Sequence, residues 1–206
     1  MLLDRDESQL VLVDFQVRLM PAIHEQAHVL ANAVRLARMA SLLKLPVIAT
    51  EENAQSLGPT VPALSDVLVE TRAQVMPKRS FSAVADGLVD RLRTPVPGRA
   101  PSGNARSLPR HLQKTATPVA QRGSIVMAGC EAHVCLLQTA LDLLDDDFDV
   151  WVVTDACGSR TERNRDAALD RLAGAGAELV TTEMVAFEWL RSVDHPAFKQ
   201  FLSLVK

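Results

Sequence analysis

The sequence predicts a three-layer α/β sandwich in which a six-stranded parallel sheet is flanked by helices on both faces. Six short apolar runs recur along the chain, and each is long enough for a buried strand but too short for a core helix. The segments between most of them repeat apolar residues at helical spacing. This alternation is typical of Rossmann-like folds, because parallel strands need crossover helices. A length of 206 residues fits one domain, so we expect a single domain over residues 1–206.

The first half of the chain supplies three of the expected strands. Continuous apolar runs predict strands at Gln9–Asp14, Leu45–Thr50 and Ala73–Pro77. Amphipathic spacing predicts a helix over Pro21–Leu43 whose core-facing residues are Leu30, Val34, Ala37 and Leu42 or Leu43. Residues 51–62 are polar and predict a loop. A shorter helix is expected from Ser82, as its N-cap, to about Leu92.

The second half begins after a segment of different character. Residues 94–123 are rich in proline, glycine, serine and arginine, and they predict a long loop or insertion that serves as a lid, serves as an oligomer arm or is disordered. The remaining elements follow from apolar runs and from a Thr-x-x-Asn helix start. Strands are expected at Ser124–Ala128, Asp149–Thr154 and Glu178–Thr181, and helices at His133–Leu144, Thr161–Ala173, Glu183–Ser192 and Pro196–Val205.

Cys135 lies in the first turn of a predicted helix, just past the carboxyl end of a predicted strand. Free backbone N–H groups at such a turn lower a thiol's pKa, and open α/β sheets bind ligands at this edge. We therefore expect a reactive cysteine, although a small core thiol is an equally good interpretation of the position alone. Cys130 and Cys157 are interpreted as packing residues.

Other polar residues follow strands whose carboxyl ends share this edge. Asp14 ends the first strand and Lys78 directly follows the third, so both could approach Cys135 if the strands are parallel. Each also has a plainer interpretation, since strand-end aspartates form turns and lysines after strands are commonly solvated. Glu51, Glu52 and Asn53 follow the second strand and either line the crevice or form a solvated loop.

Several classes of function find no support in the composition. A net charge of −3 gives no electrostatic basis for binding nucleic acid or an anionic membrane, and no apolar run has membrane-spanning length. Three cysteines without a regular pattern favour a reducing compartment, and the acidic start of the chain does not resemble a signal peptide. We therefore expect a cytoplasmic protein. No expected strand is followed by the G-x-G-x-x-G pattern of dinucleotide sites.

The run His24–His28 matches the HExxH pattern of zinc proteases. However, His24 and His28 align with Asn32 and Arg35 on what we take to be the solvated helix face. The third histidine of the longer pattern is also missing. We therefore expect no metal site here.

Three motifs, in their order and spacing, resemble the isochorismatase-like cysteine hydrolases. They are Leu12-Val-Asp-Phe-Gln16, Met76-Pro-Lys-Arg-Ser-Phe-Ser82 and Gly129-Cys-Glu-Ala-His-Val-Cys135. The runs Gln138–Leu143 and Val153–Ala156 extend the match, which covers nearly the whole chain except residues 94–123. The residues Thr50-Glu51 and Gly58-Pro-Thr60 most resemble the sequences of the isochorismatase domain-containing subgroup.

The resemblance implies a role for each motif. Cys135 would be the nucleophile, Asp14 the general base, and Lys78 the cation that favours the thiolate and orients Asp14. The backbone N–H groups of Glu131 and Cys135 would form the oxyanion hole, with a cis peptide between Cys130 and Glu131. The motifs also suggest a set of substrate-binding residues, namely Phe15, Gln16, Glu51, Phe81 and Cys130.

The implied activity is cysteine-dependent hydrolysis of an amide or related C–N bond of a small molecule through a thioester acyl-enzyme. No cofactor is expected, and no metal either, because residues 51–62 lack the histidine that metal-binding relatives carry there. A homo-oligomer, dimer or tetramer, is implied as well. The alternative is a catalytically idle oligomer of the same fold that binds ligands or responds to redox changes through oxidation of Cys135.

Overall fold

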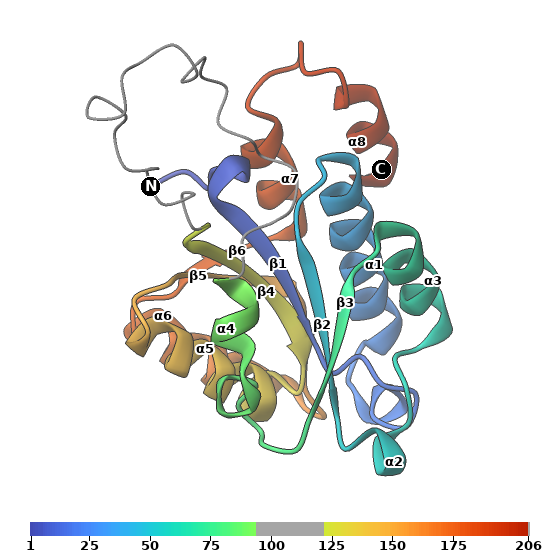
Figure 1. Ribbon diagram of the computed structural model, residues 1–206, viewed down its shortest axis with the longest axis vertical. Helices are drawn as coiled ribbons and strands as arrows, with labels where there is room; N and C mark the ends of the chain where they lie inside the picture. Colours follow the sequence, from blue (N-terminus) through green and yellow to red (C-terminus); the bar gives the residue numbers. More distant parts are fainter. Residues whose placement is uncertain (94–121, 206) are drawn as a thin grey trace, which may run out of the picture.

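The computed structural model describes residues 1–93 and 122–205, so most of the loop expected at 94–123 lies outside the described residues. The six-stranded sheet is parallel throughout, with the order β3-β2-β1-β4-β5-β6 (Figure 1). This arrangement confirms the predicted fold class. The strands are β1 (Ser8–Val13), β2 (Val47–Glu52), β3 (Gln74–Lys78), β4 (Ser124–Cys130), β5 (Asp149–Gly158) and β6 (Glu178–Val180).

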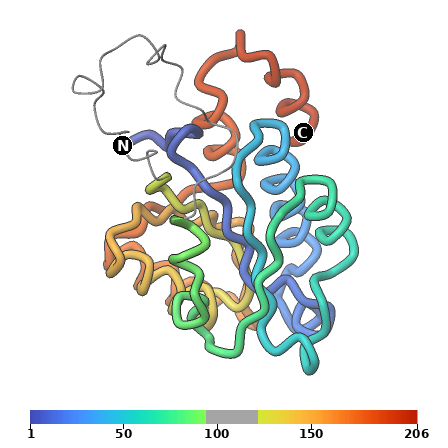
Figure 2. The backbone as a smooth tube through the Cα atoms, in the orientation of Figure 1, coloured from blue at the N-terminus to red at the C-terminus, as the bar shows by residue number. Residues whose placement is uncertain are grey.

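Helices cover both faces of the sheet and give the molecule three layers (Figures 1 and 2). Alternate strand residues point to opposite faces, so the core divides into two apolar clusters. One cluster packs against α1 (Gln26–Leu42), α3 (Pro62–Thr71), α7 (Thr182–Leu190) and α8 (Phe198–Val205). The other packs against α4 (Leu88–Leu92), α5 (Leu137–Asp145) and α6 (Glu162–Gly174).

Short helical turns complete the described chain. They are η1 (Arg5–Glu7), η2 (Met20–Ala22), α2 (Ala54–Leu57), η3 (Val84–Asp86) and the π-helical turn η5 (Ala132–Leu136). None of the helices in residues 1–93 and 122–205 combines the length and the apolar character needed to cross a membrane.

The strand order places a topological switch point between β1 and β4. The chain moves outward from β1 to β2 and β3, then returns to the other side of β1 for β4, β5 and β6. The connections therefore leave the sheet in opposite directions at β1 and β4, and ligands of open α/β sheets bind at such a switch point. Asp14 follows β1 directly, and η5 with Cys135 follows β4.

Several predicted elements differ from the observed ones. The helix expected from Pro21 begins only at Gln26, after the turn η2 and a left-handed Glu25. Its core face is also displaced by one residue, because small residues rather than only large ones lie against the sheet; the buried set is Val29, Asn32, Ala33, Leu36, Ala37, Met39 and Ala40.

Three further differences concern elements that are longer than predicted or that were not predicted. The fifth strand continues to Gly158, past an irregularity in its pairing with β4, so Asp155 lies inside β5 rather than at its end. The helix α3 occupies a stretch for which no element was expected. Part of the expected loop at 51–62 forms the single turn α2.

Candidate active site

Asp14 is held in a left-handed conformation directly after β1. Its φ is 54°, a region that aspartate tolerates better than most residues, and its side chain is fully buried. Thr50 Oγ1 donates to Asp14 Oδ1 at 2.7 Å. The other oxygen, Oδ2, is the one buried side-chain oxygen or nitrogen in the described chain that lacks an aligned hydrogen-bond donor. It lies 2.8 Å from Lys78 Nζ as an ion pair and can accept a proton.

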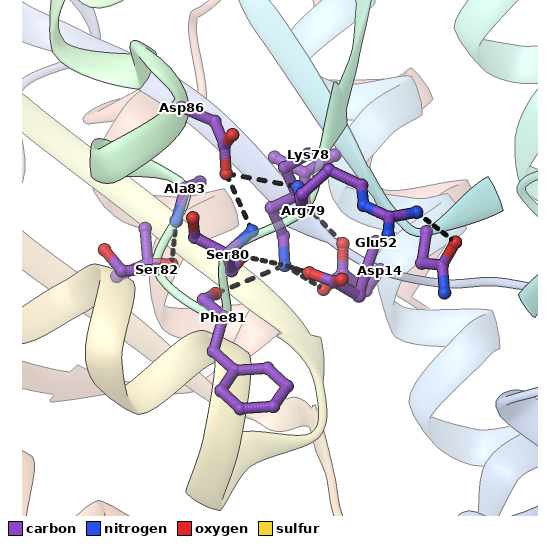
Figure 3. A network of polar contacts seen from close by, with 12 residues as sticks. Asp14, Glu52, Lys78, Arg79, Ser80, Phe81, Ser82, Ala83 and Asp86 are labelled. Atoms are coloured by element: carbon purple, nitrogen blue, oxygen red, sulfur yellow. Dashed lines mark hydrogen bonds and ion pairs between the residues drawn. The ribbon is translucent and has the colours of Figure 1, made fainter.

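Lys78 ends the edge strand β3 and turns its ammonium group inward (Figure 3). Nζ contacts Asp14 Oδ2 at 2.8 Å and donates to Glu52 Oε2 at 2.9 Å. The backbone oxygens of Ser80 and Phe81 accept from the same nitrogen at 3.2 Å each. Burial alone would lower the pKa of Lys78, but the charge of Asp14 and the hydrogen bonds outweigh burial and raise this pKa above its ordinary value. Lys78 is therefore a fixed positive charge.

Glu52 belongs to this cluster because of its strand register. In the parallel pair β2–β3, Glu52 lies opposite Lys78, and Glu51 lies opposite Pro77. The backbone of Glu52 is clamped by the buried Gln16, whose Oε1 accepts from Glu52 N at 2.9 Å and whose Nε2 donates to Glu52 O at 3.0 Å. The side chain of Glu52 is 12% exposed, whereas those of Asp14 and Lys78 are fully buried.

Cys135 completes the cluster from the other side of the switch point. It lies in the π-helical turn η5, and its Sγ and one oxygen each of Asp14 and Glu52 all lie within 4.8 Å of one another. Burial raises the pKa of the Cys135 thiol, the charge of Asp14 raises it further, and Lys78 lowers it only in part, so that the pKa is about 12. The expectation of a lowered thiol pKa is thus wrong, because burial and Asp14 outweigh the helix end and Lys78.

Two carboxylates and a thiol this close together would suit a metal cation. Here the Lys78 ammonium contacts both carboxylates and supplies the positive charge instead. At the HExxH run, His28 Nε2 lies 3.2 Å from Asn32 Nδ2. Asn32 itself is buried and donates to Asp155 O, so placing it on a solvated face was wrong.

The remaining predicted substrate-binding residues lie in varied surroundings. Phe15 and Cys130 are buried in the core cluster that packs on α1, and burial raises the pKa of Cys130 well above its ordinary value. Glu51 Oε1 accepts from Thr60 N and Thr60 Oγ1 at 2.7 and 2.8 Å, which fastens the loop. The ring of Phe81 is exposed and points away from the ion pairs (Figure 3).

Glu131, one of the two residues expected to form the oxyanion hole, lies between β4 and η5. The Cys130–Glu131 peptide is cis, as the resemblance implies. The buried Glu131 carboxylate accepts from Arg160 Nε and Nη2 at 2.9 and 3.0 Å. His133 Nδ1 lies 2.9 Å from Ser159 Oγ. These contacts tie the turn to the end of β5, and no sequence pattern indicated them.

The sequence predicts that Asp14, Lys78 and Cys135 share one edge of the sheet, and the structure places them together. Of the two neighbouring glutamates, Glu51 is the one predicted to bind substrate, whereas the carboxylate that contacts Lys78 belongs to Glu52. A thiol, a carboxylate with an available oxygen and a fixed ammonium can together support attack of sulfur on an electrophilic carbon with transfer of the thiol proton.

Comparisons with known proteins identify the family of the chain. The isochorismatase domain model matches residues 105–184. Isochorismatase domain-containing protein 2 of Rattus norvegicus is 33% identical over 98% of this chain and 82% of its own length. The solved MAR1 ribonuclease of Caenorhabditis elegans superposes with a TM-score of 0.82 at 29% identity, over 100% of this chain and 92% of that one.

A second solved structure is the YcaC gene product of Escherichia coli, described as an octameric hydrolase of unknown specificity. It superposes with a TM-score of 0.78 at 25% identity, covering 99% of this chain and 90% of that one. A relative is 33% identical to this chain over nearly its whole length, and the solved structures share its fold. Together these two findings show the family. The chain belongs to the isochorismatase family and has the fold of its hydrolases.

Proposed function

We propose that the protein is a cysteine-dependent hydrolase that cleaves an amide or related C–N bond of a small molecule. The observation that carries this proposal is the buried cluster of Cys135, Asp14 and Lys78 at the switch point of the sheet. A nucleophile, a base with an available oxygen and a fixed cation are what acyl transfer to sulfur requires.

In the proposed reaction, Cys135 Sγ attacks the substrate carbonyl carbon while its proton passes to Asp14 Oδ2. A thiol pKa of about 12 means that the resting cysteine is protonated at neutral pH, so a base is needed at the moment of attack. The C–N bond then breaks, and Asp14 returns the proton to the leaving nitrogen. Water hydrolyses the resulting thioester, and the acid leaves with the thiol restored.

Neighbouring groups have supporting roles in this proposal. Lys78 keeps Asp14 oriented and offsets negative charge that develops beside it. The backbone N–H groups of Glu131 and Cys135 would stabilise the oxyanion. Phe15, Gln16, Glu51, Phe81 and Cys130 would bind or frame the substrate, Gln16 and Glu51 through the loop contacts described above.

The ribonuclease name of the relative from Caenorhabditis elegans suggests a different substrate. A phosphodiester carries negative charge, and the cluster offers it two carboxylates beside a single lysine. The geometry therefore favours a small amide over RNA. We further propose a cytoplasmic homo-oligomer, since all three cysteines are free thiols and a relative is described as octameric.

The proposal is tested by following ammonia or amine release over a panel of small amides. We expect turnover in the wild type and a loss of at least about a hundredfold in Cys135→Ala, because covalent catalysis is removed. Cys157→Ala is the matched control, since Cys157 is a buried thiol of β5 outside the cluster. Mass spectrometry of quenched reactions should find the acyl group on Cys135.

Two results would contradict the proposal. Turnover that survives in Cys135→Ala would assign the chemistry to another group. No turnover over the panel, combined with reversible oxidation of Cys135 that changes the assembly, would favour the idle redox-responsive alternative.

A further inference from the structure

We infer that Glu52 is a specificity-determining residue that selects neutral or cationic amides and rejects substrates with a carboxylate beside the reacting carbonyl. This inference rests on the proposed function, in which Cys135 is the reacting group. Three observations carry it: the position of Glu52 in the cluster, the charge balance of the cluster, and the partial exposure of its side chain.

Glu52 lies close to the atom that would form the covalent bond. One of its carboxylate oxygens is within 4.8 Å of both Cys135 Sγ and an oxygen of Asp14. The backbone clamp to Gln16 fixes this position from both sides of the residue. A substituent on a carbonyl carbon bonded to Sγ is therefore within reach of the Glu52 carboxylate.

The charges of the cluster do not cancel. Lys78 carries one positive charge, and Asp14 and Glu52 contact it as two carboxylates, so the cluster is negative before substrate arrives. Proton transfer from Cys135 to Asp14 does not change that balance, because the negative charge moves to the oxyanion. Glu52 is thus the additional carboxylate in the cluster, since Asp14 and Lys78 alone would form a neutral ion pair.

Glu52 is also the charged member of the cluster whose side chain is partly exposed. Its side chain is 12% exposed, whereas the side chains of Asp14 and Lys78 are fully buried. An incoming group therefore meets the Glu52 carboxylate before the buried ion pair. A carboxylate there is repelled, whereas an N–H group or an ammonium is attracted.

The test uses alkylation of Cys135, which needs a reachable thiol but no amide turnover. The probes are iodoacetamide, iodoacetate and 2-bromoethylammonium, which are neutral, anionic and cationic. In each reaction the sulfur–carbon bond forms, halide leaves and the thiol loses its proton. Rates at Cys135 are located by peptide mass spectrometry and divided by the rates of 2-mercaptoethanol, which removes the intrinsic reactivity of each probe.

We expect the normalised rate of wild-type Cys135 to be at least about tenfold lower with iodoacetate than with iodoacetamide. Glu52→Gln should reduce this discrimination several-fold and should slow 2-bromoethylammonium relative to iodoacetamide. Glu52→Asp keeps the charge and should retain the wild-type order. The control Glu70→Gln removes the same charge from an exposed position on α3 and should change neither ratio.

The outcomes separate the two proposals. Equal normalised rates for the three probes in the wild type would overturn the role of Glu52 without any variant. If Glu52→Gln changes the rates of all three probes by the same factor, Glu52 only positions other groups and does not select by charge. If Glu70→Gln changes the ratios between probes as much as Glu52→Gln does, the discrimination comes from the overall charge of the protein. Absence of amide turnover with the discrimination intact would refute the hydrolase alone.

Discussion

At the scale of single residues, the protonation of Cys135 is the feature that most shapes the proposed chemistry. Helix position alone argues for a lowered thiol pKa, yet burial and the adjacent Asp14 raise it to about 12. The resting site therefore holds a protonated thiol rather than a thiolate. The neighbouring Asp14 carboxylate can take the thiol proton, and the ion pair with Lys78 holds that carboxylate in place.

This balance predicts opposite effects of two neighbouring substitutions on Cys135. Asp14→Asn removes the charge that raises the thiol pKa, so alkylation by iodoacetamide at mildly alkaline pH should become faster. Lys78→Met removes the charge that lowers the pKa, so alkylation should become slower; each change is expected to be several-fold, up to about tenfold. Amide turnover should fall in both by about a hundredfold or more, because the base is lost or misplaced.

The measurements are the alkylation rate of Cys135 in quenched samples and the amide turnover of the same preparations. Together they test the predicted direction of change in each variant. Slower alkylation in Asp14→Asn would mean that Asp14 aids the attack more than it opposes ionisation, and the electrostatic account of the thiol would fail.

The sequence identified Asp14, Lys78 and Cys135 because each follows a strand whose carboxyl end lies at one edge of a parallel sheet. It could not choose between Glu51 and Glu52. Successive residues of a strand point to opposite faces, so a shift of one residue in register exchanges their roles. Only the pairing of Glu52 with Lys78 decides that Glu52 joins the cluster and Glu51 holds the loop.

At the scale of elements, the site depends on a close approach of β1 and β4 at Gly129. A Cβ at this position would lie 2.5 Å from Val13 O and 2.6 Å from Val13 Cβ. Asp14 follows Val13, and Cys130 follows Gly129, so this contact sets the distance between the two strands that carry the candidate base and the turn with the candidate nucleophile.

Gly129→Ala should therefore separate the strand ends. We expect a loss of about 1–3 kcal/mol in the free energy of unfolding and a fall in turnover greater than the loss of folded protein explains. Urea titration and activity of the folded fraction are the measurements. Gly174→Ala is the matched control, since nothing lies within 4 Å of its added Cβ and it ends a helix; its stability should change by no more than about 1 kcal/mol. Equal effects of the two substitutions would refute the role of the close approach.

Two helices show what the hydrophobic pattern of the sequence did not predict correctly. Large apolar residues such as Leu30 and Val34 suggested the inner face of α1, but Ala33, Ala37 and Ala40 lie against the sheet because small residues let a helix approach closely. In α3, Leu64, Val67 and Leu68 have helical spacing, and Pro62 suits a first turn, so a helix could have been expected there. The irregular pairing of β5 with β4 has no sequence pattern that would reveal it.

At the scale of the whole molecule, the alternation of strands and helices predicted the layers but not the strand order. Local patterns do not state which strands are neighbours, and the return of the chain from β3 to β4 passes through residues 94–121, which lie outside the described residues. The order matters for the proposed function, because it is the return to β1 that brings Cys135 beside Asp14 and Lys78.

The buried thiols also give the whole fold a dependence on alkaline pH. Burial raises the pKa of Cys157 to about 12 from an ordinary value of 9.0, and the pKa of Cys135 lies at about 12 as well. At pH values below the ordinary thiol pKa, both the folded and the unfolded chain hold these protons, so the thiols' contribution to stability is fully present. Between that value and about 12, the unfolded chain releases protons that the folded chain keeps, so stability falls as pH rises.

Cys157→Ala isolates one of these thiols, because Cys157 lies outside the cluster. Its removal should reduce the slope of unfolding free energy against pH by up to about 1.4 kcal/mol per pH unit in the range between the two pKa values. Urea titrations at several alkaline pH values measure that slope. The chain has no tyrosine, so tyrosine titration does not contribute to it. The cavity left by the lost sulfur lowers stability equally at every pH and leaves the slope unaffected. An unchanged slope would mean that Cys157 ionises in the folded protein as readily as in the unfolded chain.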